Sequence, residues 1–205
     1  INATDEDGKS ALCYAAEQGN VELCWILVSY GADVDGKADT SPLQCAVAKS
    51  LYEICLQLIN AGADLNRKDN QGRNALFTAA INGSEVKIVQ LLIESGGICV
   101  NDNDSVKNTV LHYAAKTGEN YICEELCEAG ADVNVQNEDR ITPFMISAQE
   151  GNIDLMLLFL DNGAESDKVD NDGRTALHLA AMGNHPDVCM VLLSTGIDIN
   201  QQDHN

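Results

Sequence analysis

Residues 175–181 read Thr-Ala-Leu-His-Leu-Ala-Ala, and five other segments of the chain repeat this phrase in altered form. The third place of the phrase carries a large apolar residue that anchors each unit. The six anchors are Leu12, Leu43, Leu76, Leu111, Phe144 and Leu177. They are separated by 31, 33, 35, 33 and 33 residues, so the mean period is 33. A period of this length indicates a repeat array in which each unit buries its apolar face against its neighbours.

A second phrase, Gly-Ala-Asp followed by an apolar residue and then Asp or Asn, ends the units. Its copies, two of them looser, are residues 31–35, 62–66, 130–134, 163–165 and 196–200. Between the two phrases, each unit has a short Leu-x-x-Ala-Ala segment and then an amphipathic segment, such as residues 86–92. Both patterns predict helices, and the second helix ends at the glycine of the closing phrase.

The residue between the two predicted helices must adopt a positive φ angle, which glycine and asparagine do most readily. The sequence places such a residue at Gly19, Gly83, Gly118, Gly151 and Asn184. These five positions are therefore predicted to be turns between paired helices.

We expect the second unit to be the most irregular. Ser50 stands at its turn and Asp39 replaces a glycine in its loop, while Lys107 and Arg140 replace the same glycine in later units. The first interval between anchors is two residues short, which predicts a clipped loop around residues 35–37. The third interval is two residues longer than the mean period of 33.

These phrases resemble those of ankyrin repeats, and the resemblance covers essentially the whole chain. It implies an all-α fold, a solenoid of stacked helix-turn-helix units with projecting β-hairpin loops. The implied repeats are residues 5–35, 36–68, 69–103, 104–136, 137–169 and 170–202. Residues 1–4 match the end of a preceding repeat and residues 203–205 the start of a following one, so we expect the chain to be part of a longer array.

The composition narrows the choice of partner. The chain has 205 residues, 45% of them hydrophobic and 4% aromatic, which predicts a folded protein with an aliphatic core. Its 32 acidic and 12 basic residues give a formal net charge of −20. Nucleic acid and anionic membrane surfaces are not expected partners, because basic side chains bind both. No apolar run reaches the roughly 18 residues that cross a bilayer, so we expect no direct membrane insertion.

Eight cysteines occur in a chain without a signal-peptide pattern. This combination favours reduced thiols and an intracellular location, in the cytoplasm and/or the nucleus. Cys24, Cys55, Cys123 and Cys189 share one place on the second helices, so we expect them to be buried as small apolar residues. Cys99 is the thiol expected to be exposed.

No group of residues predicts chemistry. The cysteine and histidine spacings match no metal-binding motif, and no nucleophile elbow, phosphate-binding loop or metalloprotease motif occurs. His112 and His178 follow the anchor in two units, and the resemblance implies that they make structural hydrogen bonds between neighbouring units. We therefore expect no enzyme activity, no catalytic residue, no cofactor and no metal.

The resemblance implies that a protein or peptide partner binds the concave surface formed by the loop tips and the first helices. The residues expected to contact it are Lys9, Glu17, Lys37, Lys49, Lys68, Arg73, Ile81, Lys116, Ile141, Glu150, Arg174 and Met182. Acidic and basic residues balance over this predicted surface, so the net negative charge is expected elsewhere. Trp25, the only tryptophan, is expected on the outward side of a second helix. There it either packs on a preceding unit or marks a second interface.

Three asparagines of the closing phrase resemble substrates of asparaginyl hydroxylase, because a leucine precedes each of them by eight residues. They are Asn66, Asn134 and Asn200, and Asn134 is the best candidate.

Two classes of function are open at this point. The first is a non-catalytic protein–protein interaction module, or scaffold. The second is a structural or targeting segment of a larger membrane protein, scaffold or enzyme, which contacts other domains of its own parent chain. Sequence beyond these 205 residues would distinguish the two.

Overall fold

The computed structural model describes residues 1–197 and 201–203. It confirms the all-α fold, because the described residues form twelve helices and their strand pairing is limited to isolated bridges. These bridges join Thr4 to Ser10 and Asn103 to Thr109. The chain divides into two compact units, Ile1–Cys99 and Val100–Asn205.

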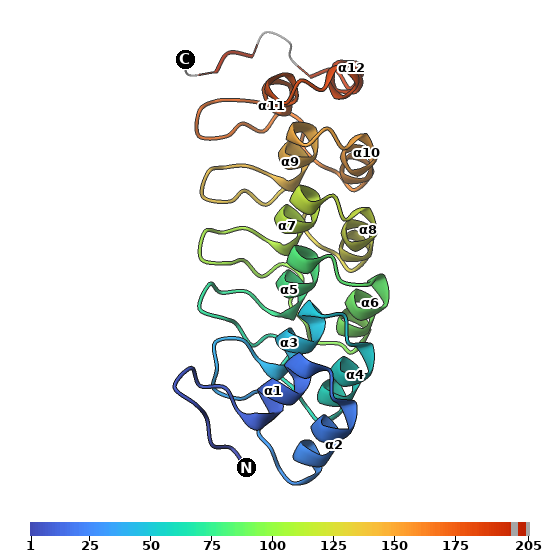
Figure 1. The fold of residues 1–205 in the computed structure, drawn as a ribbon. Coiled ribbons are helices and arrows are strands. Elements are labelled where there is room, and N and C mark those ends of the chain that lie inside the picture. Colours follow the sequence, from blue (N-terminus) through green and yellow to red (C-terminus); the bar gives the residue numbers. More distant parts are fainter. Residues whose placement is uncertain (198–200, 204–205) are drawn as a thin grey trace. The chain divides into compact units, whose positions relative to one another are not determined.

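The N-terminal unit contains three helix pairs, each joined by a tight turn (Figure 1). Its helices are α1 (Ala11–Gln18), α2 (Val21–Ser29), α3 (Pro42–Ala48), α4 (Tyr52–Asn60), α5 (Ala75–Asn82) and α6 (Val86–Glu94). Helices α1, α3 and α5 pack in an inner layer, and α2, α4 and α6 pack in an outer layer. Long loops project from the inner layer, away from the outer one.

The C-terminal unit repeats this plan with three further helix pairs. Its helices are α7 (Val110–Thr117), α8 (Asn120–Glu128), α9 (Pro143–Gln149), α10 (Ile153–Asp161), α11 (Ala176–Met182) and α12 (Pro186–Ser194). Helices α7, α9 and α11 form the inner layer, and α8, α10 and α12 form the outer layer.

The first residue of the repeated phrase is the N-cap of each inner helix. The side chains of Ser10, Ser41 and Thr142 accept a hydrogen bond from the backbone N–H three residues later. This bond satisfies one of the N–H groups that a helix start leaves unpaired. Pro42 and Pro143 follow their caps at the first helical position, where a missing N–H is harmless. The phrase is therefore a helix-start signal.

The turns between paired helices have the predicted backbone conformation. The φ angle is +72° at Gly19, +60° at Gly83, +74° at Gly118, +76° at Gly151 and +59° at Asn184. All five predicted turn positions are confirmed.

Within residues 1–197 and 201–203, three residues other than glycine and asparagine adopt the same left-handed conformation. The φ angle is +54° at Ser50, +62° at Lys107 and +60° at Arg140. A side chain in this region crowds its own backbone, which costs about 1 kcal/mol or more per residue.

Replacing Arg140 by glycine is expected to raise the free energy of unfolding by about 0.5–1 kcal/mol, because glycine adopts the +60° φ angle without strain. Urea unfolding followed by circular dichroism measures this change. Arg140→Ala is the matched control, since it removes the side chain but keeps the strain. Equal stability of the glycine and alanine variants would contradict the argument.

The short loop that follows α2 departs from the others. Asp39 stands where other loops have a residue with positive φ, and its own φ angle is not positive. The guanidinium of Arg67, from the next loop, donates hydrogen bonds to the backbone carbonyls of Asp35, Gly36 and Ala38. A charged side chain thus satisfies the carbonyls of the clipped loop.

Five of the six anchors are buried, and only Leu177 is half-buried. The buried-cysteine prediction is likewise confirmed for Cys24, Cys55 and Cys123 but wrong for Cys189, which is half-buried. Leu177 and Cys189 belong to α11 and α12, the last pair that the structure describes, which packs on the preceding pair from one side. In the other repeats, the following helix pair covers the positions equivalent to Leu177 and Cys189. One-sided packing leaves these two residues partly exposed.

Burial affects the protonation of two of the thiols. Burial raises the pKa of Cys24 to about 11 and that of Cys55 to about 12, so both are protonated at neutral pH. Cys99 is exposed, as predicted.

Candidate protein-binding surface

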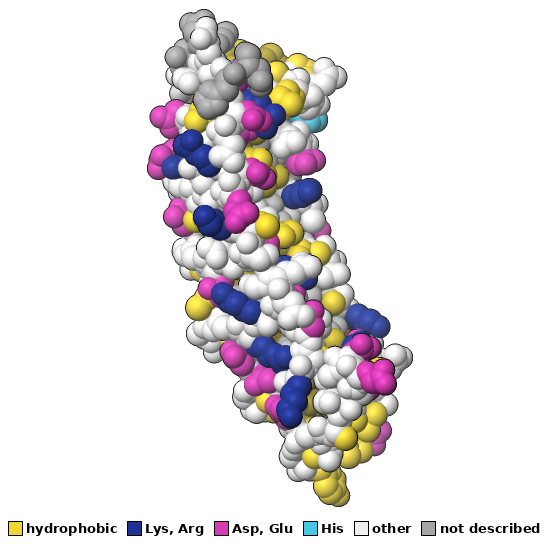
Figure 2. Space-filling model, turned by 90° about the vertical axis from the view of Figure 1, so that its left-hand side faces the viewer, with side chains coloured by type: hydrophobic (Ala, Val, Ile, Leu, Met, Phe, Trp, Pro, Cys, Tyr) yellow, Lys and Arg dark blue, Asp and Glu magenta, His cyan; other side chains and the backbone are white. Residues whose placement is uncertain are grey.

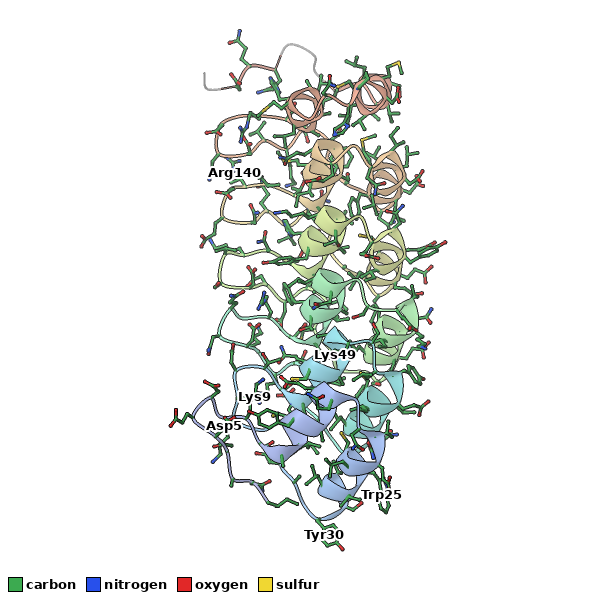
Figure 3. The ribbon with its side chains drawn as sticks, viewed as in Figure 1. Asp5, Lys9, Trp25, Tyr30, Lys49 and Arg140 are labelled. Atoms are coloured by element: carbon green, nitrogen blue, oxygen red, sulfur yellow. The ribbon has the colours of Figure 1, made fainter. Side chains whose placement is uncertain are left out.

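In the N-terminal unit, three of the predicted contact residues form one cluster. The Lys9 ammonium lies 2.5 Å from the Glu17 carboxylate, and the Lys49 ammonium donates to the Glu17 carbonyl oxygen at 2.7 Å. The hydrogen bond from its own ammonium to the Glu17 carboxylate raises the pKa of Lys9. Figure 3 shows Lys9 and Lys49 on the inner-helix side. Lys9, Glu17 and Lys49 are called the α1–α3 cluster below.

Two residues beside this cluster were missed by the sequence analysis. The Tyr14 hydroxyl donates to the Asp5 carboxylate at 2.5 Å, and the Lys9 ammonium lies 5.6 Å from the centre of the Tyr14 ring. The hydrogen bond from Tyr14 lowers the pKa of Asp5. The C-terminal unit has the same arrangement, in which Tyr113 donates to Asp104 at 2.7 Å. An aspartate nine residues before a tyrosine was therefore the signal that the sequence offered.

Two predicted contact residues are paired within their own loops. The Arg73 guanidinium lies 2.7 Å from the Asp69 carboxylate, and the Arg174 guanidinium lies 2.7 Å from Asp170 and 2.9 Å from Asp172. The hydrogen bond to Asp170 raises the pKa of Arg174. These arginines stabilise the loops, and only part of each guanidinium is available to a partner.

In the C-terminal unit, the loop side carries a cleft of about 420 Å³ between the loops and the inner helices α7 and α9. Three predicted contact residues, Lys116, Ile141 and Glu150, line it. The other lining residues are Asn108, His112, Tyr113, Asn137, Asp139, Ile146 and Gln149. We call this the α7–α9 cleft. Its lining combines two isoleucines with amide, acidic and basic side chains.

The floor of this cleft is fixed by His112. Its Nδ1 accepts a hydrogen bond from the Thr109 backbone N–H at 3.0 Å, so its Nε2 carries the proton and donates to the Ile141 carbonyl at 3.0 Å. The second bond links α7 to the next loop, which confirms the structural role expected for this histidine. Burial lowers the pKa of His112 to about 4, so the ring is neutral at pH 7.

A glutamine performs the same task in the N-terminal unit. Gln44 occupies the place of His112, accepts from the Ser41 backbone N–H at 2.9 Å and donates to the Arg73 carbonyl at 2.9 Å. The role of Gln44 was not predicted, because glutamine replaces the histidine of the repeated phrase at this place. His178 also contacts its helix cap, with Nδ1 at 2.9 Å from the Thr175 hydroxyl.

The remaining predicted contact residues do not belong to the α1–α3 cluster and do not line the α7–α9 cleft. Lys37 and Lys68 are exposed and Ile81 is half-buried, while Met182 exposes 66% of its surface. Figure 2, which views the loop side, shows acidic and basic side chains interspersed within each unit. That mixture agrees with the expected balance of charge on this side.

The asparagines proposed for hydroxylation connect neighbouring loops. Asn66 donates to the Gly97 carbonyl at 2.6 Å and accepts from the Cys99 N–H at 2.8 Å. Asn134 makes the same pair of bonds, to Gly163 and Glu165. A hydroxylase must break these bonds to reach either side chain. Asn200 lies outside the described residues, and hydroxylation stays a prediction.

Within residues 1–197 and 201–203, no group of three or more histidine, cysteine or acidic side chains is arranged to hold a metal ion. None of the helices in this range is long and apolar enough to span a membrane.

Stacked helix pairs with projecting loops and a loop-side cleft define a repeat solenoid. The family model for ankyrin repeats (3 copies) matches residues 1–69, 52–137 and 111–203. The chain therefore belongs to the ankyrin-repeat family, whose members are generally protein-interaction modules.

The curated relatives are much longer proteins. The chain is 29% identical to transient receptor potential cation channel subfamily A member 1 of Homo sapiens, over 100% of this chain and 19% of that protein. It is 26% identical to the Caenorhabditis elegans homolog, over 95% of this chain and 16% of the homolog. It is 32% identical to neurogenic locus notch homolog protein 2 of Homo sapiens, over 76% of this chain and 6% of that protein. The chain thus spans about a fifth or less of these relatives.

Proposed function

We propose that this chain is a non-catalytic module that binds a protein or peptide in the α7–α9 cleft. The observation that carries this proposal is that Lys116, Ile141 and Glu150, chosen from sequence, line a single cleft. They come from an inner helix, a loop and the end of the next inner helix. His112 joins these elements, so the cleft is supported on a fixed floor.

The lining of the cleft favours a peptide with one apolar side chain. Ile141 and Ile146 offer an apolar contact, and the Gln149 amide can pair with a peptide backbone. The amides of Asn108 and Asn137 are hydrogen-bonded to each other. Lys116 and Glu150 carry opposite charges, which would orient the bound segment. The α1–α3 cluster is a second, polar contact in the N-terminal unit.

Ile141→Asp is expected to weaken partner binding at least tenfold, because it replaces an apolar side chain of the cleft lining by a charged one. Proteins captured by the wild-type chain are identified by mass spectrometry, and the affinity of the purified ligand is then measured for each variant. Met190→Asp is the matched control, since Met190 is exposed on the outer helix α12. Equal loss of binding in both variants, or in neither, would contradict the proposal. Circular dichroism checks the fold of each.

A second candidate is supported by the comparisons. Because the chain matches only part of each relative, it could serve as a segment that contacts other domains of its own parent protein. The same variants test this reading when they are placed in the full-length protein. An intracellular location stays a prediction.

A further inference from the structure

A second cleft, of about 460 Å³, lies on the outer helices of the N-terminal unit, between α2 and α4. The α2 side is lined by Val21, Trp25 and Val28, and the α4 side includes Glu53, Leu56 and Gln57. We call it the α2–α4 cleft. It is separate from the loop side, where the proposed function places the partner.

The aromatic wall of this cleft is the only tryptophan of the chain. Trp25 exposes 62% of its surface, and Figure 3 shows it on the outer side of the unit. Val21, Trp25 and Val28 are spaced by four and three residues, so they form one stripe of α2, directed toward α4. The exposed Ile26 and Tyr30 lie on a different stripe.

The polar groups of the cleft are hydrogen-bond acceptors and neutral groups, and no basic residue lines it. Glu53 supplies a carboxylate at an exposed position of α4. The Oε1 of Gln57 is buried and has no hydrogen-bond partner among the described residues. An unpaired buried acceptor is unfavourable, so a donor that reaches it supplies a hydrogen bond that the described residues do not.

The same outer face already holds a cation in a similar setting. The Lys87 ammonium lies 5.5 Å from the centre of the Tyr52 ring and 2.7 Å from the Glu85 carboxylate. Lys87 therefore pairs with Tyr52 and Glu85, and the charge of Glu53 also acts on it, although Lys87 does not line the α2–α4 cleft. In the α2–α4 cleft, Trp25 and Glu53 are the corresponding aromatic and acidic residues, and the chain provides no cation for them among the lining residues.

We propose that the α2–α4 cleft binds an arginine side chain presented by a peptide segment of a partner protein. The guanidinium stacks on the Trp25 indole, pairs with the Glu53 carboxylate and donates to the Gln57 amide after a rotation of its last torsion. Arginine fits better than lysine because its planar group stacks on an aromatic face and still directs several donors sideways. Val21, Val28 and Leu56 receive apolar neighbours of the arginine.

The fluorescence of Trp25 tests this directly, because no other tryptophan contributes. The whole chain is titrated with a capped Leu-Arg-Leu peptide and with matched peptides in which citrulline or lysine replaces arginine. We expect a saturable change with the arginine peptide and at least tenfold weaker binding of the uncharged citrulline peptide. The lysine peptide is expected to bind with intermediate affinity.

Variants distinguish binding of the arginine peptide in the α2–α4 cleft from non-specific attraction of a basic peptide to an acidic protein. Glu53→Gln is expected to weaken arginine-peptide binding at least fivefold, whereas Glu94→Gln, which removes an exposed charge at the end of α6, leaves it unchanged. Ile141→Asp also leaves it unchanged, which keeps this result independent of the α7–α9 cleft. Equal binding of the arginine and citrulline peptides, equal loss in the two glutamate variants, or no saturable change overturns the proposal.

Discussion

Replacing Gly151 by alanine is expected to lower the free energy of unfolding by about 3 kcal/mol, from two separate causes. The φ angle at Gly151 is +76°, which strains any side chain. In addition, a β-carbon there would lie 2.4 Å from Nδ1 of His185. The ring cannot easily move away, because Gly183 packs on it as well and a β-carbon there would lie 2.6 Å from the ring.

The two causes are separated by a matched glycine. Gly163 has a φ angle of +84° and open space around it, so Gly163→Ala is expected to lose only about 1 kcal/mol. Adding His185→Ala to Gly151→Ala should recover part of the larger loss, since the obstructing ring is then absent. Urea unfolding of the four chains measures these differences. Equal losses for Gly151→Ala and Gly163→Ala would show that the close approach to His185 is unimportant.

The second large effect is a dependence of stability on pH through His112. Burial lowers its pKa from 6.5 to about 4, although the hydrogen bond to Ile141 and the nearby Asp104 act in the opposite direction. Between these two values the unfolded chain binds more protons than the folded chain, so stability rises with pH across this window. The stability that neutral His112 contributes is present above pH 6.5 and is lost as the pH falls toward 4. The loss between pH 7 and pH 5 is about 2 kcal/mol.

His112→Gln is the variant that isolates this contribution, because Gln44 shows that glutamine makes both hydrogen bonds at the equivalent place. The variant is expected to lose about 2 kcal/mol less than the wild type when the pH is lowered from 7 to 5. All other groups titrate in both chains, so their effects cancel in the comparison. If urea unfolding at the two pH values gives parallel losses, His112 does not titrate as its burial implies.

The architecture could be predicted from local signals. Each repeat combines a helix cap, an apolar anchor and, after the first helix, a turn residue. Caps and turn residues act on backbone groups only a few residues away. Ser10 caps α1 and Gly19 ends it, as the spacing required. The family model confirms the ankyrin assignment that rested on these phrases.

The roles of individual side chains depended largely on contacts between successive repeats, whose residues lie some 30 positions apart in the sequence. Gln44 and Arg67 have no motif of their own, and their hydrogen bonds to neighbouring repeats appear only when loops and helices are brought together. Tyr14 differs from them, because its partner Asp5 lies only nine residues before it in the sequence. Likewise, Cys55 and Cys189 occupy equivalent places on the outer helices α4 and α12, but only Cys55 is covered from both sides.

The repeated phrases alone therefore determined the helices, their turns and their stacking, because caps, turn residues and apolar spacing are properties of short segments. The tertiary structure decided which surface residues come together. Lys116, Ile141 and Glu150 meet because a loop folds against the helix of the preceding pair, and Trp25 meets Glu53 and Gln57 because α2 packs beside α4. These contacts depend on how successive helix pairs pack against each other. The order of residues within one repeat does not specify that packing.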